Sequence, residues 1–170
     1  MSHGNKKAIR ILPISEEHIE SFYNCLDSVA RERRYLGLVK APPLESTSHF
    51  VLSNIKGRIP QHVALEDSRV VGWCDITPKK GEGFTHCGTL GMGVLPDYRG
   101  RGIGAKLLEE TLLAAKKFGL ERVELEVFAS NVPAIRLYEN RGFSHEGVKR
   151  KARKLDGIFD DVLMMALFLN

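Results

Sequence analysis

The sequence predicts an α/β fold, an α+β sandwich in which a mixed, mostly antiparallel sheet of seven strands is flanked by about four helices. Alternating apolar runs are spread along the chain, amphipathic stretches separate them, and three strands follow one another through short turns. Of 170 residues, 43% are hydrophobic and 27% charged, as in a globular domain with a full core. We expect a single domain over residues 1–170, with residues 1–7 as a disordered or tag-derived start.

The first elements are a strand, two helices and an irregular segment between the helices. Residues 8–14 are β-prone, and Ser15 caps a helix whose apolar positions recur at helical spacing. A second, shorter helix covers residues 44–56. Residues 31–44 lose this periodicity and contain Gly37 and two prolines, so we expect a loop of the kind that often carries binding residues.

Three strands and the longest helix come next. Residues 62–66 and 69–77 are two apolar runs separated by an Asp-Ser pair, which predicts a hairpin, and residues 85–95 form a third antiparallel strand. Residues 103–118 carry an apolar stripe at helical spacing, and Gly119 is placed to end that helix.

The last elements are a strand, a short helix and a closing hairpin. Residues 122–129 alternate as a strand, and Ser130 or Asn131 then caps a helix with a proline in its first turn. Residues 143–155 and 158–169 form a hairpin turned at an Asp-Gly pair.

Residues 90–105 connect an apolar strand, through a Pro-Asp break and a run of glycines and arginines, to the longest helix. The first amides of a helix lack internal partners, and the helix dipole adds positive charge there, so this layout favours an anion. Gly100, Gly102 and Gly104 have no Cβ to keep a phosphate away from the backbone. We infer a cofactor that carries a diphosphate.

Two other interpretations of the glycine run carry less weight. Residues 100–105 satisfy G-x-G-x-x-A, the dinucleotide-binding pattern, and Glu124 or Glu126 lies near the offset of a ribose ligand. The 66 residues after Gly104 leave too little chain for the remaining units of a doubly wound sheet. A purely structural turn rarely needs three glycines in five residues flanked by arginines.

Two motifs resemble the GNAT superfamily of acetyl-CoA-dependent N-acetyltransferases: R-x-x-G-x-G from Arg99 to Gly104, and N-x-x-A-x-x-L-Y-E-x-x-G-F from Asn131 to Phe143. The resemblance covers residues 90–167, and the first half agrees in element order. It implies direct transfer of an acetyl group from acetyl-CoA to a primary amine in a ternary complex, without a metal. The motifs are specific for superfamily and cofactor but leave the acceptor open.

The resemblance also assigns residues to the cofactor. Backbone amides at the helix start would hold the pyrophosphate of coenzyme A; these residues are Arg99, Gly100, Arg101, Gly102, Gly104 and Ala105. The backbone of Met92 and Val94 would pair with the pantetheine arm, since the family's strand splays from its neighbour there and leaves a free edge. Asn131 and Tyr138 match positions that contact the pantetheine and the thiol. A helix cap and a half-buried aromatic are their alternative roles.

Acetyl transfer to an amine requires loss of an ammonium proton, polarisation of the thioester carbonyl and protonation of the leaving thiolate. The resemblance makes Tyr138 the acid for the thiolate, and the N–H of Met92 or Gly93 can stabilise the oxyanion. No cysteine nucleophile is needed, because family members transfer the group directly. Cys74 and Cys87 therefore read as small strand residues.

The base is open between several residues. Glu126 matches the glutamate proposed as base in the branch that acetylates ribosomal-protein N-termini, and burial in the sheet interior would suit a carboxylate to that task. An alternating polar strand residue is an equal alternative for Glu126. His86 and Asp75, on adjacent strands, are further candidate bases, and for both we expect a structural role.

The acceptor should be selected by the irregular segment and the closing hairpin. Arg33 and Arg34 can hold a carboxylate, which suits an amino acid or another small metabolite, and a ribosomal-protein-like N-terminus is the alternative acceptor. A different class, a non-catalytic module that binds RNA or the ribosome, rests on the net charge of +4 and the basic tract 148–154. We interpret that tract as a charged edge strand and do not expect nucleic acid as a partner.

The remaining expectations concern assembly and location. A homodimer is expected from the family alone. The three cysteines show neither CxxC spacing nor a ligand cluster, so we expect no zinc site and no disulfide framework. The start of the chain lacks an apolar core, and no stretch approaches the ~20 apolar residues that cross a bilayer. We therefore expect a cytoplasmic protein with no membrane partner.

Overall fold

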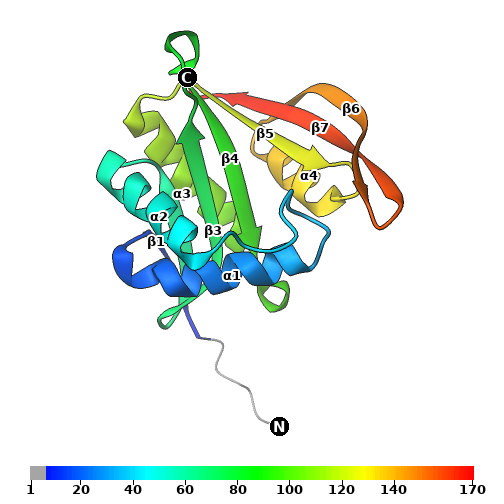
Figure 1. Ribbon diagram of the computed structural model, residues 1–170. Coiled ribbons are helices and arrows are strands. Elements are labelled where there is room, and N and C mark those ends of the chain that lie inside the picture. The colour runs from blue at the N-terminus through cyan, green and yellow to red at the C-terminus, as the bar shows by residue number, and fades with distance from the viewer. Residues whose placement is uncertain (1–6) are drawn as a thin grey trace.

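One seven-stranded sheet, with strand order β1-β2-β3-β4-β5-β7-β6, runs through the computed structural model, which describes residues 7–170 (Figure 1). The strands are β1 (Ile9–Pro13), β2 (Gln61–Glu66), β3 (Arg69–Pro78), β4 (Cys87–Val94), β5 (Arg122–Phe128), β6 (Ser144–Leu155) and β7 (Ile158–Phe168). The helices are α1 (Ile19–Arg31), α2 (Leu44–Gly57), α3 (Ile103–Phe118) and α4 (Val132–Asn140). The predicted fold class is confirmed.

The expectation for the start of the chain falls almost entirely on residues 1–6, which lie outside the described part. Lys7 is described, and its ammonium pairs with Asp67 in the β2–β3 turn. No helix within residues 7–170 combines the length and apolar character needed to cross a membrane.

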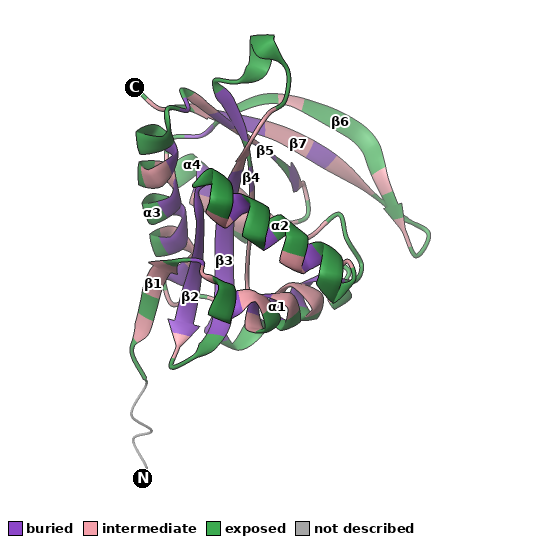
Figure 2. Cartoon of the chain, turned by 60° about the vertical axis from the view of Figure 1, so that its left-hand side comes forward, coloured by how far each residue is buried: buried purple, intermediate pink, exposed green. Residues whose placement is uncertain are grey.

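Helices cover both faces of the sheet. On one face, Trp73 of β3 packs edge-on against Phe22 of α1, with ring centroids 5.8 Å apart. On the other face, a Cβ on Gly72 would lie 3.1 Å from the side chain of Leu107 in α3. Figure 2 shows α3 on one side of the buried central strands and α1 with α2 on the other. The hydrophobic core therefore forms two layers, one on each face of the sheet.

The α3 helix occupies the residues that the sequence predicts, because both ends are marked by glycines. Gly102 before it has φ 76° and Gly119 after it has φ 102°, which is left-handed backbone that glycine adopts without a Cβ clash. Leu107 and Leu108 between them are fully buried. The helix is thereby fixed so that its first turn lies beside the end of β4.

The parallel contact between β4 and β5 is short. Only three residue pairs form it, from Cys87 opposite Arg122 to Thr89 opposite Glu124. Beyond these pairs the two strands diverge, as Figure 1 shows, and β4 continues to Val94 while β5 continues to Phe128. The strand splay implied by the family resemblance is therefore present, and it leaves a wedge-shaped opening in the sheet.

The irregular segment and the closing hairpin meet beside this opening. Residues 32–43 contain neither helix nor strand, and Arg33 among them has φ 58°. Its guanidinium donates to both carboxylate oxygens of Asp156 in the β6–β7 turn, at 2.8 and 3.1 Å. Arg153 of β6 also donates to the Arg33 carbonyl at 2.7 Å. These contacts hold the loop against the hairpin.

Two details differ from the sequence prediction. The strand expected from residue 85 begins at Cys87, because a 3₁₀ turn over Glu82–Phe84 precedes it. The helix capped by Ser15 opens with a 3₁₀ turn, and α1 begins only at Ile19. The basic tract lies in β6 at the edge of the sheet, as predicted.

Candidate active site

A cavity of about 570 Å³ fills the opening between β4 and β5. Its walls come from both strands, the turn before α3, helix α4 and the loop after α1. Most of the predicted cofactor residues line it; these are Met92, Val94, Arg99, Gly100, Gly102, Gly104, Ala105, Asn131 and Tyr138. Arg101 is not in the lining, and its guanidinium lies 5.1 Å from the ring centroid of Tyr98.

Unpaired amides form one end of the cavity. The first bond of α3 runs from Lys106 N–H to the Gly102 carbonyl, so the amides of residues 103–105 have no partner within the helix. Gly100 and Gly102 have φ of 70° and 76°. A Cβ on either would meet no atom within 4 Å, so both glycines are required by backbone conformation and not by close packing within the chain. This end is suited to an anion.

Arg99 corrects one expectation, because its amide is already engaged and donates to the Pro96 carbonyl. Its side chain donates to the Val94 carbonyl at 2.8 Å and makes a two-bond pair with Glu32 at 2.6 and 2.8 Å. These hydrogen bonds to Glu32 raise the pKa of Arg99. Its guanidinium also lies 4.6 Å from the ring centroid of Tyr35. Arg99 thus joins the end of α1 to the end of β4.

The free edge of β4 is set by the alternation of its hydrogen bonds. Leu95 N–H donates to Val71, and Lys79 N–H donates to Cys87, which fixes which residues exchange bonds with β3. In an antiparallel ladder every second residue does so; thus Gly93 turns its backbone toward β3, whereas Met92 and Val94 turn theirs toward the opening. Of the two candidate oxyanion donors, only the Met92 N–H faces the cavity.

Tyr138 and Asn131 border the cavity from the α4 side. Tyr138 is buried, its ring packs at 5.7 Å from Phe143, and desolvation raises the pKa of its hydroxyl. None of the described residues hydrogen-bonds that hydroxyl. Asn131 accepts from Ala134 N–H at 3.4 Å as the cap of α4 and also lines the cavity. Asn131 is therefore both a helix cap and a cavity residue, and Tyr138 is both a buried aromatic and a cavity residue.

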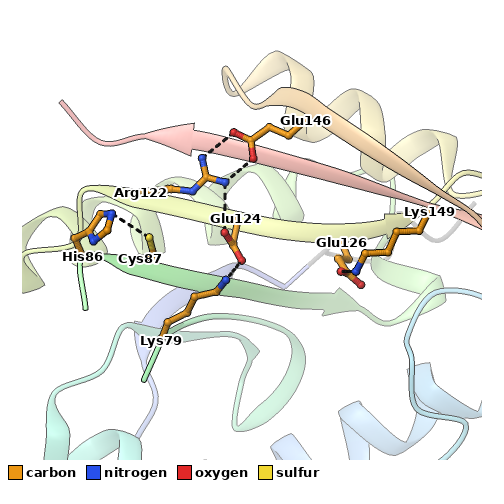
Figure 3. A network of polar contacts seen from close by, with 8 residues as sticks. All are labelled: Lys79, His86, Cys87, Arg122, Glu124, Glu126, Glu146 and Lys149. Atoms are coloured by element: carbon orange, nitrogen blue, oxygen red, sulfur yellow. Dashed lines mark hydrogen bonds and ion pairs between the residues drawn. The ribbon is translucent and has the colours of Figure 1, made fainter. Parts of the chain in front are cut away.

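Glu126 corrects a second expectation, because it is exposed and not desolvated in the sheet interior. Glu126 lines the cavity, its carboxylate forms an ion pair with Lys149 of β6, and its side chain is 56% exposed. Figure 3 shows this pair beside a separate network in which Arg122 bridges Glu124 and Glu146. Desolvation thus gives no support to Glu126 as the base.

The other two candidate bases differ in their surroundings. His86 precedes β4, its ring lies 3.3 Å from the Cys87 sulfur (Figure 3), and it is not among the cavity-lining residues. Asp75 lies in β3 directly opposite Gly91, a cavity-lining glycine of β4. A Cβ on Gly91 would lie 3.6 and 3.7 Å from its two carboxylate oxygens. Asp75 is half-buried, and desolvation of its carboxyl raises the pKa of Asp75 to about 7.

The predicted acceptor residues prove to be neighbours of the cavity and not part of its wall. Arg33 is paired with Asp156, and Arg34 is exposed with its guanidinium 5.6 Å from the centroid of Tyr35. The loop instead contributes Tyr35, Leu36 and Gly37 to the lining, which the sequence analysis missed. The only signal was an aromatic–aliphatic pair that directly follows the charged run of residues 31–34.

Metal ligands are not assembled around the cavity. Across residues 7–170, no cluster of three or more His, Cys, Asp or Glu side chains has the arrangement of a metal site. The open amides, the free strand edge and the cavity that they border together fit a ligand with a phosphate end and a hydrogen-bonding arm, as coenzyme A has.

Comparison with curated proteins relates the chain to two kinds of acetyltransferase. The L-amino acid N-acetyltransferase of Escherichia coli (strain K12) is 32% identical over 109 residues, 64% of this chain and 67% of that protein. The ribosomal protein bS18-alanine N-acetyltransferase of the same strain is 38% identical over 76 residues, 45% of this chain and 51% of that protein. The chain thus spans about half the length of this second relative.

Solved structures share the fold at lower identity. The protein yncA of Salmonella typhimurium, solved with its cofactor acetyl-CoA, superposes with a TM-score of 0.90 at 18% identity, covering 96% of this chain and 95% of that one. The acetyltransferase of GNAT family from Streptococcus pneumoniae gives 0.88 at 23% identity, over 95% and 99%. These similarities concern the fold.

The family itself follows from the sequence model of the acetyltransferase (GNAT) family, which matches residues 22–143. This range contains the open edge of β4, the turn before α3 and the whole of α4. Because the match covers well over half of the chain, this protein belongs to the GNAT acetyltransferase family and is an acyltransferase that uses acetyl-CoA.

Proposed function

We propose that this enzyme acetylates the primary amine of a small metabolite, an amino acid foremost, by direct transfer in a ternary complex. The observation that carries the proposal is the cavity between β4 and β5, closed on one side by a loop that is itself tied to the β6–β7 turn. Family membership removes the alternative of a non-catalytic RNA-binding module.

The residues at the two ends of the cavity have separate binding roles. The amides of residues 100–105 hold the pyrophosphate, and Gly104 keeps the first turn of α3 open, since a Cβ there would point toward Leu137 and Met92 at 3.5 Å. The free carbonyl of Met92 and the free backbone groups of Val94 bind the pantetheine arm as a neighbouring strand would. The side chain of Asn131 borders the same arm.

Acetyl-CoA supplies an activated acetyl group as a thioester. Met92 N–H donates to the carbonyl oxygen as negative charge develops there. Tyr138 keeps its proton because its hydroxyl is desolvated, and it gives that proton to the departing sulfur. Arg99 takes no part in the transfer but fixes the end of β4 from which these donors project.

The acceptor class is supported by the loop-to-hairpin tie and by one relative. Contacts of Arg33 with Asp156 and Arg153 oppose the passage of a continuous polypeptide across the opening, and they favour a small amine or a chain end. The L-amino acid N-acetyltransferase matches 64% of this chain. Arg34, exposed beside the cavity-lining Tyr35, is the remaining guanidinium for an acceptor carboxylate.

A second candidate, acetylation of a protein N-terminus, is supported by the 38% identity to the ribosomal protein bS18-alanine N-acetyltransferase. The end of a polypeptide, like a small amine, can enter the opening without crossing the loop that Arg33 ties to the hairpin. The two acceptors differ in length and not in the attacking group, so kinetics with acceptors of graded size separate them.

The test is a thiol-release assay with acetyl-CoA and a panel of amino acids, amino acid amides, polyamines and short peptides. We expect the largest kcat/KM for an amino acid, with a lower value for its amide because the carboxylate is then missing. Arg34→Gln should raise KM for the amino acid and leave KM for the amide unchanged, and Lys117→Gln, at the exposed end of α3, is the charge-matched control. A preference for peptides would favour the N-terminal acceptor.

Three buried free thiols, Cys25, Cys74 and Cys87, support a reducing compartment such as the cytoplasm. A homodimer stays a family-based prediction, which sedimentation of the purified chain tests.

A further inference from the structure

Asp75 is not part of the cavity wall, but its carboxylate lies beside Gly91, a residue that is part of it. Directly opposite residues of adjacent strands share a face, so Gln61, Asp75 and Gly91 form one row across β2, β3 and β4. The parallel register continues this row across the opening to Glu126 of β5. The only member without a side chain is Gly91, which stands between Asp75 and the cavity.

The Asp75 carboxylate lies on the β4 side of its own strand. Both oxygens are within 3.7 Å of the position that a Cβ on Gly91 would take. It accepts a long hydrogen bond of 3.5 Å from the Thr77 hydroxyl, and within residues 7–170 no cation pairs with it. A carboxylate placed in this way retains acceptor capacity for a further donor.

The groups around Asp75 are uncharged on three sides. From β2, the Gln61 side chain is buried, with its Oε1 accepting from Asn54 of α2 at 2.8 Å and its Nε2 without a partner among the described residues. Two residues before Asp75 on the same strand, Trp73 packs against Phe22 of α1, so the neighbouring side chains toward α1 are aromatic. The nearest charged pair in the row is Glu126 with Lys149, beyond the opening. Surroundings without a nearby cation disfavour the charged form of the carboxyl, so that it can gain and lose a proton near neutral pH.

We propose that Asp75 is the general base, which accepts the proton of the acceptor amine as that amine attacks from the α1 face of the sheet. This inference rests on the proposed acetyltransferase reaction. A C–N bond forms at the acetyl carbonyl and the C–S bond breaks. The ammonium first loses one proton to solvent, the second amine proton passes to a carboxylate oxygen of Asp75 during attack, and the thiolate receives the proton of the Tyr138 hydroxyl. Solvent then takes the proton from Asp75 and returns one to Tyr138.

Glu126 has a different part in this arrangement. Its pair with Lys149 places a fixed, exposed carboxylate at the rim, where it attracts an ammonium before proton transfer. Loss of Glu126 should therefore act on KM for the acceptor, whereas loss of Asp75 should act on kcat.

The experiment measures the pH dependence of kcat in the wild type and in Asp75→Asn, Glu126→Gln and Glu124→Gln. The wild-type rate should rise with pH and level off above an apparent pKa near 7. Asp75→Asn should lower kcat by about 100-fold or more and abolish this limb. Glu124→Gln, a carboxylate on the same face that pairs with Lys79 and Arg122, is the matched control with an unchanged profile.

Two measurements need no turnover. The carboxyl carbon of Asp75, assigned by its loss in Asp75→Asn, should titrate near neutral pH in ¹³C NMR spectra of the free protein. Acetyl-CoA should raise the melting temperature of Asp75→Asn as much as that of the wild type, because the base does not touch the cofactor. Gly91→Ala provides a second variant, since its methyl group would stand 3.6 Å from the carboxylate and lower kcat.

The outcomes separate the two levels of the argument. An Asp75→Asn enzyme with kcat within threefold of the wild type and the same pH limb overturns Asp75 as the base. A lost limb in Glu126→Gln alone overturns it too and assigns the base to Glu126. No acetyl transfer by the wild type to any amine in the panel overturns the proposed function together with this inference.

Discussion

Gly93→Ala is expected to destabilise the protein by overpacking the centre of the sheet. A Cβ on Gly93 would lie 2.4 Å from Cη2 and 2.6 Å from Cζ3 of Trp73. The indole is 3% exposed and packs edge-on against Phe22, so it has no free space into which to move. Adding one methyl group to such a site costs about 1–3 kcal/mol.

That free energy converts to a measurable shift in melting temperature. For a chain of this length, 1 kcal/mol corresponds to roughly 2–4 °C, so Gly93→Ala should melt about 2–12 °C below the wild type. Trp73 is the only tryptophan, and its fluorescence reports on the perturbed contact directly. Far-UV circular dichroism on the same samples follows the fold as a whole.

Gly91→Ala is the matched control, because it lies two residues away on the same strand and the same face. Its Cβ would meet the Asp75 carboxylate at 3.6 Å, an ordinary contact distance, so its melting temperature should stay within about 1 °C of the wild type. Equal melting temperatures for Gly93→Ala and the wild type would refute the reasoning that Trp73 is rigidly packed.

Three further predictions concern charge and backbone strain. Asp75 has a folded pKa of about 7 against an ordinary 3.8, so the native state binds more protons than the unfolded state between these values. Wild-type stability should therefore fall as pH rises from 4 to 7, by at most about 4 kcal/mol. Asp75→Asn should raise the urea midpoint at pH 8 more than at pH 5, and equal gains at both would contradict this. Gly102→Ala forces a Cβ into φ 76°, costs about 1–2 kcal/mol and should weaken acetyl-CoA binding in calorimetry more than Gly104→Ala. Glu32→Gln removes the two-bond pair with Arg99, so its melting temperature should drop by the equivalent of about 1–3 kcal/mol, and an unshifted melt would count against that pair.

Local patterns predicted most helix and strand boundaries, because the signals lie next to the elements they define. Glycines at 102 and 119 bracket α3, and Asp156 with Gly157 turns the last hairpin, each at positive φ. The anion site was predicted for the same reason, since the glycine run and the start of α3 are adjacent in the chain.

Contacts between residues far apart in the chain could not be predicted from such local patterns. Glu32 pairs with Arg99 from 67 residues away, and Lys149 of β6 pairs with Glu126 of β5 across the intervening strand β7. The register that brings Asp75 opposite Gly91 depends on a hairpin loop of unpredicted geometry. These contacts decide which candidate carboxylate is exposed and which is desolvated, so the choice of base could not be made from the sequence.

The three residue pairs between β4 and β5 also have a mechanical meaning. They are the backbone rungs that join a four-stranded ribbon, β1 to β4, to a three-stranded ribbon, β5 to β7. A molecule hydrogen-bonded along the free edge of β4 extends this short contact and restricts the motion of one group of strands relative to the other. Amide hydrogens of β4 and β5 should then exchange more slowly with solvent when the opening is occupied, because binding makes local opening of the sheet less frequent.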